Sequence, residues 1–149
     1  MIEELKGFKK LKVIDKAHEA TLHVYRLTAS YPKHELYGLI SQLRRASTSI
    51  PSNIAEGYSR GTSKEFRQFL NIARGSLSEV RYLALLSKDL KYITENDYFE
   101  LELELQEVSK MLSGLHKSIS HRAENSSLIS DNNKSISYKA ENSSLISDN

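Results

Sequence analysis

Apolar residues recur at helical spacing through roughly the first three quarters of the chain. In residues 13–30 they fall three or four positions apart, which predicts an amphipathic helix. Pro32 disfavours helical backbone in the residue before it, so we expect this helix to stop before Tyr31. The expected buried face consists of Val13, Ala17, Ala20, Val24 and Leu27.

Three further helices are predicted for residues 35–58, 62–90 and 94–116. The second has an apolar stripe that includes Ile40, Leu43, Ile50 and Ile54, preceded by Leu36. The fourth has a similar stripe, which consists of Leu101, Leu105, Val108, Leu112 and Leu115.

Helix start and stop signals separate the last three of these segments. Gly61 suits the left-handed conformation that ends many helices. Thr62 followed by Glu65 has the spacing of a capping box, and Thr94 followed by Asp97 repeats the Ser/Thr-x-x-acid pattern. Short links therefore join long helices.

The segment FELELEL, residues 99–105, alternates apolar and acidic residues as a strand would. A single strand would have no partner, so we interpret the segment as helix with a broad apolar face. Helices of roughly 18 to 28 residues joined by tight turns favour an all-α fold, an antiparallel up-down-up-down four-helix bundle.

A nearly exact repeat marks the end of the chain. The unit KSISHRAENSSLISDNN, from Lys117, is followed by KSISYKAENSSLISDN, from Lys134. We therefore divide the chain into a bundle, residues 1–116, and a duplicated tail, residues 117–149. Two copies are too few for a solenoid, and the Ser- and Asn-rich composition favours a disordered tail or a frayed helical extension over a functional tail peptide.

Pro51 lies inside the second predicted helix, where it lacks an amide donor and crowds the carbonyl of Ser47. If Pro51 instead opened a new helix, Ile50 would be a poor N-cap. We favour a kinked helix in which hydroxyls of the run Ser47, Thr48, Ser49 and Ser52, or water, satisfy the freed carbonyls. Asn53 is expected to make a buried hydrogen bond at the bend rather than to bind a ligand.

Composition excludes several classes of protein. The 149 residues include no cysteine, which removes disulfide frameworks and thiol catalysis. No apolar run is long enough for a membrane span or signal peptide, so we expect a cytoplasmic protein. The net charge is +2, but residues 36–93 have nine basic against four acidic residues, and residues 94–116 have one against six. We therefore expect a basic side and an acidic side.

Residues 39–90 contain the combination QLRRA, SIPSNIAEG and GSLSE. On these motifs the chain resembles the four-helix-bundle proteins encoded in intervening sequences of bacterial large-subunit ribosomal RNA genes. The likeness begins at FKKLKVIDKAHEATLHVYRLT and covers about residues 8–115, although Ile14 stands where relatives often have tryptophan.

This resemblance implies a four-helix bundle that often assembles as a homopentamer and whose biochemical function is unsettled. The accessory proteins of diversity-generating retroelements look similar. Their likeness implies a basic pentameric barrel that binds nucleic acid and a protein partner, a reverse transcriptase.

A basic row recurs every seven residues through the end of the second helix and along the third. The third helix also has apolar residues at four of its seven heptad positions, a width that we interpret as surface left over for self-association. The small residues Ala73, Gly75 and Ser76 would allow a neighbouring helix to come close. The row consists of Arg60, Arg67, Arg74, Arg81 and Lys88.

Two interpretations of the basic row stay open. Its guanidinium groups suit phosphate oxygens, which predicts salt-sensitive binding of structured RNA or an RNA–DNA hybrid. Alternatively, the row pairs with acids of the fourth helix, and the protein is an interaction scaffold without nucleic-acid binding. Arg44, Arg45, Lys9, Lys10 and Lys12 would widen a basic surface.

Other chemistry is sparse. His18 and His23 are five apart and do not share a helix face, so we predict no metal site and no cofactor. Glu56 and Glu79 lie near the apolar stripes and are expected to be partly buried, with Glu79 bonded to Ser76, Tyr82 or an arginine of a neighbouring subunit. No phosphate loop or nucleophile elbow is present, and we predict that the protein is not an enzyme. The residues expected to matter for structure are Pro51, Asn53, Glu56, Gly57 and Glu79.

Overall fold

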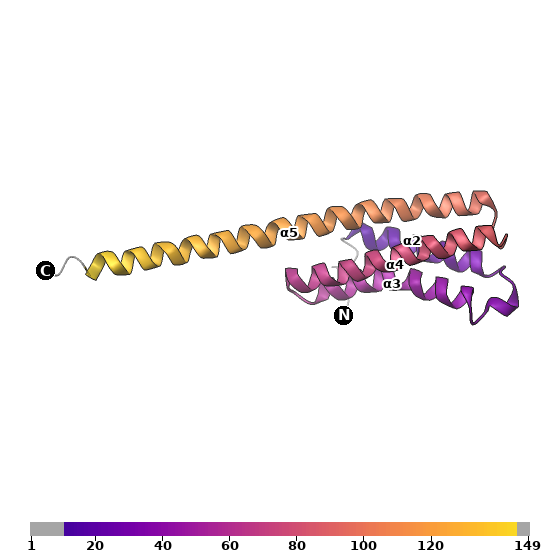
Figure 1. The fold of residues 1–149 in the computed structure, drawn as a ribbon, viewed down its shortest axis with the longest axis horizontal. Helices are drawn as coiled ribbons and strands as arrows, with labels where there is room; N and C mark the ends of the chain where they lie inside the picture. Colours follow the sequence, from indigo (N-terminus) through magenta and orange to yellow (C-terminus); the bar gives the residue numbers. More distant parts are fainter. Residues whose placement is uncertain (1–10, 146–149) are drawn as a thin grey trace.

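The computed structural model describes residues 11–145, and its four long helices pack as a four-helix bundle (Figure 1). The all-α prediction is confirmed, and no strand is present in the described range. The segment that alternates apolar and acidic residues lies within the last helix. The elements are α2 (Lys12–Thr28), the short 3-10 helix η1 (Lys33–Glu35), α3 (Leu39–Ser59), α4 (Ser63–Asp89) and α5 (Glu95–Leu145).

Each helix packs against two others and thereby closes the core. α2 and α4 each contact both α3 and α5. The predicted apolar faces form this core, because burial of aliphatic side chains is the main favourable contribution to folding. The largest fully buried aliphatic side chains are Leu43, Ile50, Ile54, Leu70, Leu101, Leu105 and Leu112.

The predicted start and stop signals of α4 and α5 are confirmed. The amide of Glu65 donates to Thr62 Oγ1 at 3.2 Å, and the Thr62 hydroxyl donates to the Glu65 carboxylate at 2.7 Å. At the start of α5 the amide of Asp97 donates to Thr94 Oγ1 at 3.0 Å, and here the amide of Thr94, not its hydroxyl, donates to the Asp97 carboxylate at 3.2 Å. Gly61 has φ +82°, the left-handed conformation that ends α3.

The start of α3 differs from the prediction. Glu35 belongs to η1, and α3 begins only at Leu39. The reason is local, because the Glu35 carboxylate accepts a hydrogen bond from the Leu39 amide at 2.9 Å and so caps the helix from outside. Leu36, expected in the apolar stripe, is therefore in the link and half exposed.

α3 continues through Pro51 without interruption, so the proline does not open a new helix. The carbonyl that it leaves free, that of Ser47, accepts a hydrogen bond at 3.0 Å from the hydroxyl of Thr21 on α2. The hydroxyl of Ser52 donates to the next carbonyl, that of Thr48, at 2.8 Å. A neighbouring helix thus supplies the main missing donor, while the bend itself stays a prediction.

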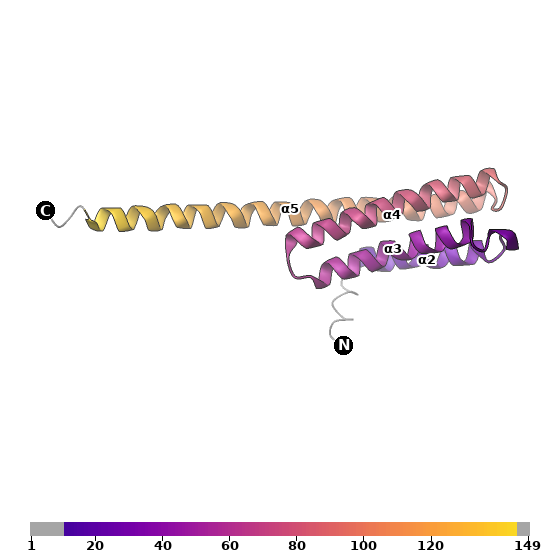
Figure 2. The same cartoon turned by 60° about the horizontal axis from the view of Figure 1, so that its bottom comes forward.

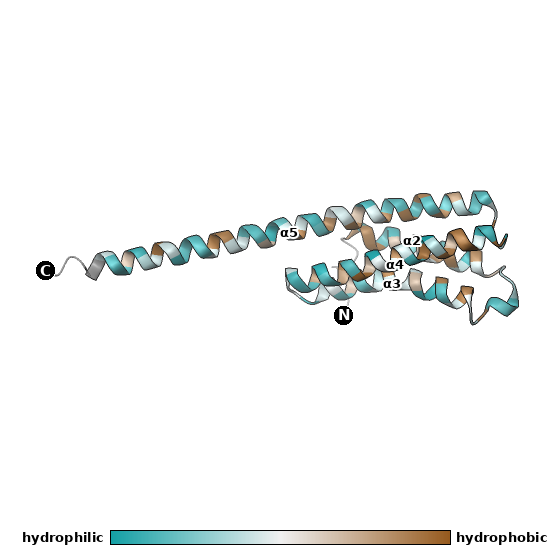
Figure 3. Ribbon diagram, viewed as in Figure 1, coloured by the Kyte–Doolittle hydropathy of each residue, from teal (hydrophilic) through white to brown (hydrophobic). Residues whose placement is uncertain are grey.

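The duplicated tail is helical as far as the structure describes it. Both copies extend α5 past the end of the bundle in one direction (Figures 1 and 2). Ile119 is buried against the bundle, but from Glu124 onward the described side chains are exposed. Apolar positions of this extension are scattered among polar ones (Figure 3). One cause is that a 17-residue step turns a helix by about 260°, so the copies do not align their apolar residues.

Among the described residues, no helix combines the length and apolar character that crossing a membrane requires.

Candidate nucleic-acid interface

From Arg67 onward, the basic row lies along the edge of α4 that faces α5, whereas Arg60 follows the end of α3. The contacts that place it run in opposite order along the two helices: Lys88 lies over the ring of Tyr98 at 5.0 Å, and Arg81 bonds Glu102. A seven-residue step drifts only about 20° around a helix, so Arg67 and Arg74 continue the same edge toward the start of α4.

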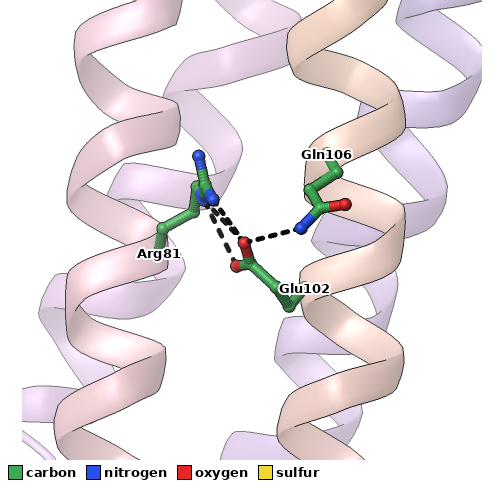
Figure 4. Close-up of polar contacts among 3 residues, drawn as sticks. All are labelled: Arg81, Glu102 and Gln106. Atoms are coloured by element: carbon green, nitrogen blue, oxygen red, sulfur yellow. Dashed lines mark hydrogen bonds and ion pairs between the residues drawn. The ribbon is translucent and has the colours of Figure 1, made fainter.

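Arg81 is neutralised inside the subunit. Its guanidinium forks onto both carboxylate oxygens of Glu102, with Nε at 3.0 Å and 3.2 Å from them, and Gln106 Nε2 donates to the same carboxylate (Figure 4). This hydrogen bonding raises the pKa of Arg81 above its usual value. Because a bidentate pair satisfies the charge of the arginine, Arg81 has little capacity left for phosphate.

Two more members of the row are also engaged. Lys88 is 3.5 Å from the carboxylate of Asp89, in addition to its contact with Tyr98. Arg60, at the end of α3, pairs with Glu56 one turn earlier at 2.8 Å and lies over the ring of Phe69. The interpretation in which the row meets acids of α5 therefore fits Arg81, whereas Arg60 and Lys88 pair with acids of their own segments.

Arg67 and Arg74 have no acidic partner among the described residues. Arg67 donates only to the carbonyl of Ser63 at 3.4 Å, and Arg74 is exposed. The cause is the composition of α5 opposite them. Acidic residues end at Glu107, and residues 108–123 contain none.

α5 instead contributes two lysines near Arg67 and Arg74. Lys110 and Lys117 are exposed and one heptad apart, so they share a stripe of α5 as Arg67 and Arg74 share a stripe of α4. Extending the register of the Arg81–Glu102 contact by one and two heptads puts Lys110 and Lys117 at about the heights of Arg74 and Arg67 along the bundle. We call these four residues the basic pairs. Lys110 and Lys117 were not among the residues predicted to bind, and their signal in the sequence is the end of the acidic run.

Arg44 and Arg45 do not join this surface. Arg44 is held against α2, where its Nε donates to Thr28 Oγ1 at 2.9 Å and its guanidinium covers the ring of Tyr25. Arg45 is exposed on α3, on the other side of the bundle from the basic pairs. Lys12 is exposed at the start of α2, and Lys9 and Lys10 lie outside the described residues.

Asn53 makes hydrogen bonds within α3, but they are partly rather than fully buried. Its Nδ2 donates to the carbonyl and to the hydroxyl of Ser49, at 2.7 Å and 2.8 Å. The Ser49 hydroxyl in turn lies 2.8 Å from that of Ser76 on α4. The side chain thus supports the α3–α4 contact.

Gly57 allows α3 and α4 to approach closely. A Cβ atom at this position would lie 2.6 Å from the Cβ of Phe69 and 2.9 Å from the Cδ2 of Phe66. Gly75, expected to admit a neighbouring helix, has no atom within 4 Å of the same position. The close approach therefore occurs at the end of α3.

Glu56 and Glu79 are exposed, contrary to the expectation that they are partly buried. Each lies two positions from a buried residue, Ile54 and Leu77 respectively, which corresponds to about 200° around the helix. Among the described residues, Glu79 has no hydrogen bond or ion pair, so neither Ser76 nor Tyr82 is its partner.

Most of the wide apolar stripe of α4 is used inside the subunit. α4 packs on two helices, and its buried apolar residues serve both contacts, with Phe66 and Leu86 partly buried beside them. Ile72 is the member of the stripe that stays half exposed. The width of the stripe is therefore explained by two neighbours within the bundle and gives no separate support for self-association.

The histidines do not form a metal site. His23 is buried and its Nδ1 lies 3.1 Å from Glu104, while His18 is exposed on another face of α2. Within residues 11–145, no three His, Asp or Glu side chains are grouped as a metal ion would require.

Comparisons with known proteins agree with this architecture. Residues 9–114 match the family of the 23S rRNA-intervening sequence protein. A similar crystal structure is that of a protein of unknown function from the S23 ribosomal protein family of Bacteroides thetaiotaomicron. It has 27% sequence identity and a TM-score of 0.66, over 70% of this chain and 98% of that one.

A comparison with curated proteins gives no match. The family match spans most of the bundle, including the QLRRA, SIPSNIAEG and GSLSE motifs. The chain therefore belongs to the 23S rRNA-intervening sequence protein family.

Proposed function

We propose that this protein is a cytoplasmic, non-enzymatic homo-oligomer that binds nucleic acid, with structured RNA or an RNA–DNA hybrid as ligand. The observation that carries the proposal is the lack of acidic partners for Arg67 and Arg74, next to an acid-free stretch of α5 that adds Lys110 and Lys117. Cations without internal partners are the ones available to phosphate.

The arrangement suits a duplex backbone better than single strands. Members of each pair are separated by about 10 Å along their helix, since each residue rises by about 1.5 Å. Side chains at this spacing contact separate phosphates. Stacking of unpaired bases requires free aromatic rings between the cations. Residues 108–123 contain no Phe, Tyr or Trp, and the ring of Phe69, between Arg67 and Arg74, is covered by Arg60.

An oligomer would repeat the basic pairs around a symmetry axis, which multiplies weak phosphate contacts into strong binding. Because the chain resembles families that often form pentamers, we expect five subunits. A protein partner such as a reverse transcriptase stays a prediction.

The alternative is a protein-interaction scaffold, and the internal pairing of Arg81 with Glu102 favours it. Binding of a generic RNA duplex at increasing salt separates the two. The proposal predicts that log affinity falls steeply with log salt and that the double variant Arg67→Glu with Arg74→Glu abolishes binding while the oligomer persists. No detectable binding at about 50 mM salt, or dissociation of the oligomer by the same variant, favours the scaffold.

A further inference from the structure

A groove between α2 and α3 combines exposed apolar side chains with two arginines. It has a volume of about 470 Å³, and its lining includes Tyr25, Leu36, Tyr37, Arg44 and Arg45. Tyr37 is 93% exposed and Leu36 51% exposed, although both are large apolar side chains. We call this feature the groove.

The groove is also electropositive. One of its walls comes from residues 36–48, and the chain contains no acidic residue from there to residue 55. Arg44 is held in place by Thr28 and Tyr25, and Arg45 has no hydrogen bond or ion pair among the described residues. A complementary surface must therefore be apolar at its centre and acidic at its edges.

The start of α5 has this composition. Phe99 is 59% exposed and Leu103 51% exposed, and the two are one turn apart on α5. Glu100 and Glu107 lie beside them, on the side of α5 where Glu107 is 3.8 Å from Lys16 of α2, and residues 95–107 include no lysine or arginine. We call Phe99 and Leu103 with these acids the ridge.

The groove and the ridge lie at the same end of the bundle. The rings of Tyr31 and Tyr92 are 5.4 Å apart, and Tyr92 Oη lies 3.3 Å from the Glu35 carboxylate. These contacts join the α2–α3 link, which carries Tyr37, to the α4–α5 turn, which precedes Phe99. The two surfaces are thus at similar heights along the bundle but on different faces.

We infer that the ridge of one subunit docks in the groove of a second copy of this chain. The contact is head-to-tail, since two different surfaces meet. Because they lie at similar heights, successive copies are related by rotation with little translation, and such a contact closes into a ring rather than extending as a filament. This inference rests on the homo-oligomeric part of the proposed function and names its interface.

The inference assigns Arg44 and Arg45 to the subunit contact and leaves the basic pairs outside it. It also accounts for the charge division of the chain: the ridge ends at Glu107, the last acid before the acid-free residues 108–123 that carry Lys110 and Lys117.

Two acidic substitutions test the inference, Tyr37→Asp in the groove and Phe99→Asp on the ridge. Both side chains are exposed, so circular dichroism is expected to show wild-type helicity and melting. Light scattering coupled to size exclusion should show an oligomer for the wild type and a monomer for each variant. Tyr138→Asp, which places the same charge on the exposed extension of α5, is the matched control and should keep the wild-type mass.

Mixing the two variants gives the decisive measurement. Each retains one intact surface, so the ridge of Tyr37→Asp can dock in the groove of Phe99→Asp, whereas each of the two altered surfaces carries a carboxylate in place of the aromatic side chain at its centre. The mixture should form a one-to-one heterodimer and nothing larger. Wild-type mass for either single variant, or a mixture that stays monomeric, overturns the inference while a wild-type oligomer still supports the proposed function. A monomeric wild type overturns both.

Discussion

The hydroxyl of Thr21 on α2 donates a hydrogen bond to the carbonyl of Ser47 on α3, the carbonyl that Pro51 deprives of its usual amide donor. The same hydroxyl lies 2.8 Å from the carbonyl of Ala17. An interior proline is thus tolerated because a packed neighbour supplies the donor that the helix cannot.

Thr21→Val is therefore expected to lower the free energy of unfolding by about 1–2 kcal/mol, because it leaves a buried carbonyl unpaired. In a Pro51→Ala background the restored amide serves that carbonyl, so the cost of Thr21→Val should shrink. Urea unfolding of the four proteins in this double-mutant cycle measures the coupling. Thr48→Val, which removes an exposed hydroxyl bonded only within α3, is the control. Equal costs in both backgrounds would contradict the assignment.

Replacing glycine by alanine should lower the free energy of unfolding in α3 and raise it in α4. Gly57→Ala places a methyl group 2.6 Å from the Cβ of Phe69, so α3 and α4 must separate, and we expect a loss of about 1–2 kcal/mol. Gly75→Ala meets no atom within 4 Å and should gain about 0.5–1 kcal/mol from helix propensity. Denaturant unfolding measures both. A stabilising Gly57→Ala would show that the helices do not approach as closely as described.

Arg74 and Arg81 provide a matched test of the basic row. Arg81→Gln breaks the pair with Glu102 and is expected to lower stability by about 1 kcal/mol while duplex binding is unchanged. Arg74→Gln should leave stability unchanged and reduce the slope of log affinity against log salt by about 0.9, the value for one lost phosphate contact. If Arg81→Gln weakened duplex binding and Arg74→Gln did not, the phosphate contacts would lie at the Arg81 end of the row instead.

Periodicity and local spacing were sufficient to predict the four helices, the apolar faces and the capping pairs of Thr62 and Thr94. All of these depend on residues within one or two turns of each other. The donor for Ser47 lies 26 residues away along the chain, and no local pattern indicates it.

The sequence could not predict which arginines of the basic row pair with acids inside the subunit, for a related reason. A seven-residue repeat shows that Arg67, Arg74 and Arg81 share an edge, but the register between α4 and α5 determines which of them meets an acid. The end of the acidic run at Glu107 becomes informative only once that register is known.

Two tyrosines should ionise late in an alkaline titration. Burial, with a smaller contribution from Asp97, raises the pKa of Tyr31, and a hydrogen bond with Ser87 only partly offsets this. Partial burial and the carboxylate of Glu35 raise the pKa of Tyr92.

A raised pKa means that the folded state holds the proton more tightly than the unfolded state does. The stability that these tyrosines contribute is therefore complete below pH 10.0, the ordinary pKa, and declines as the pH rises above it. Tyrosinate absorbance, followed as the pH is raised, should show a step at a higher pH than ordinary tyrosines give. Tyr31→Phe should reduce the size of this step, and Tyr37→Phe should not change it. Loss of the late step in Tyr37→Phe would contradict this.

The extension of α5 should melt before the bundle. Its side chains from Glu124 onward are exposed and contact no other helix, and helices without tertiary packing are marginal in water. A chain ending at Ala123 keeps Ile119 and the bundle core, so its free energy of unfolding should equal that of the full chain. Far-ultraviolet circular dichroism should show a gradual loss of helicity at low temperature in the full chain that the shortened chain lacks. A single transition of the full chain, with a higher melting temperature than that of the shortened chain, would instead show that the extension is packed against something, most simply another subunit.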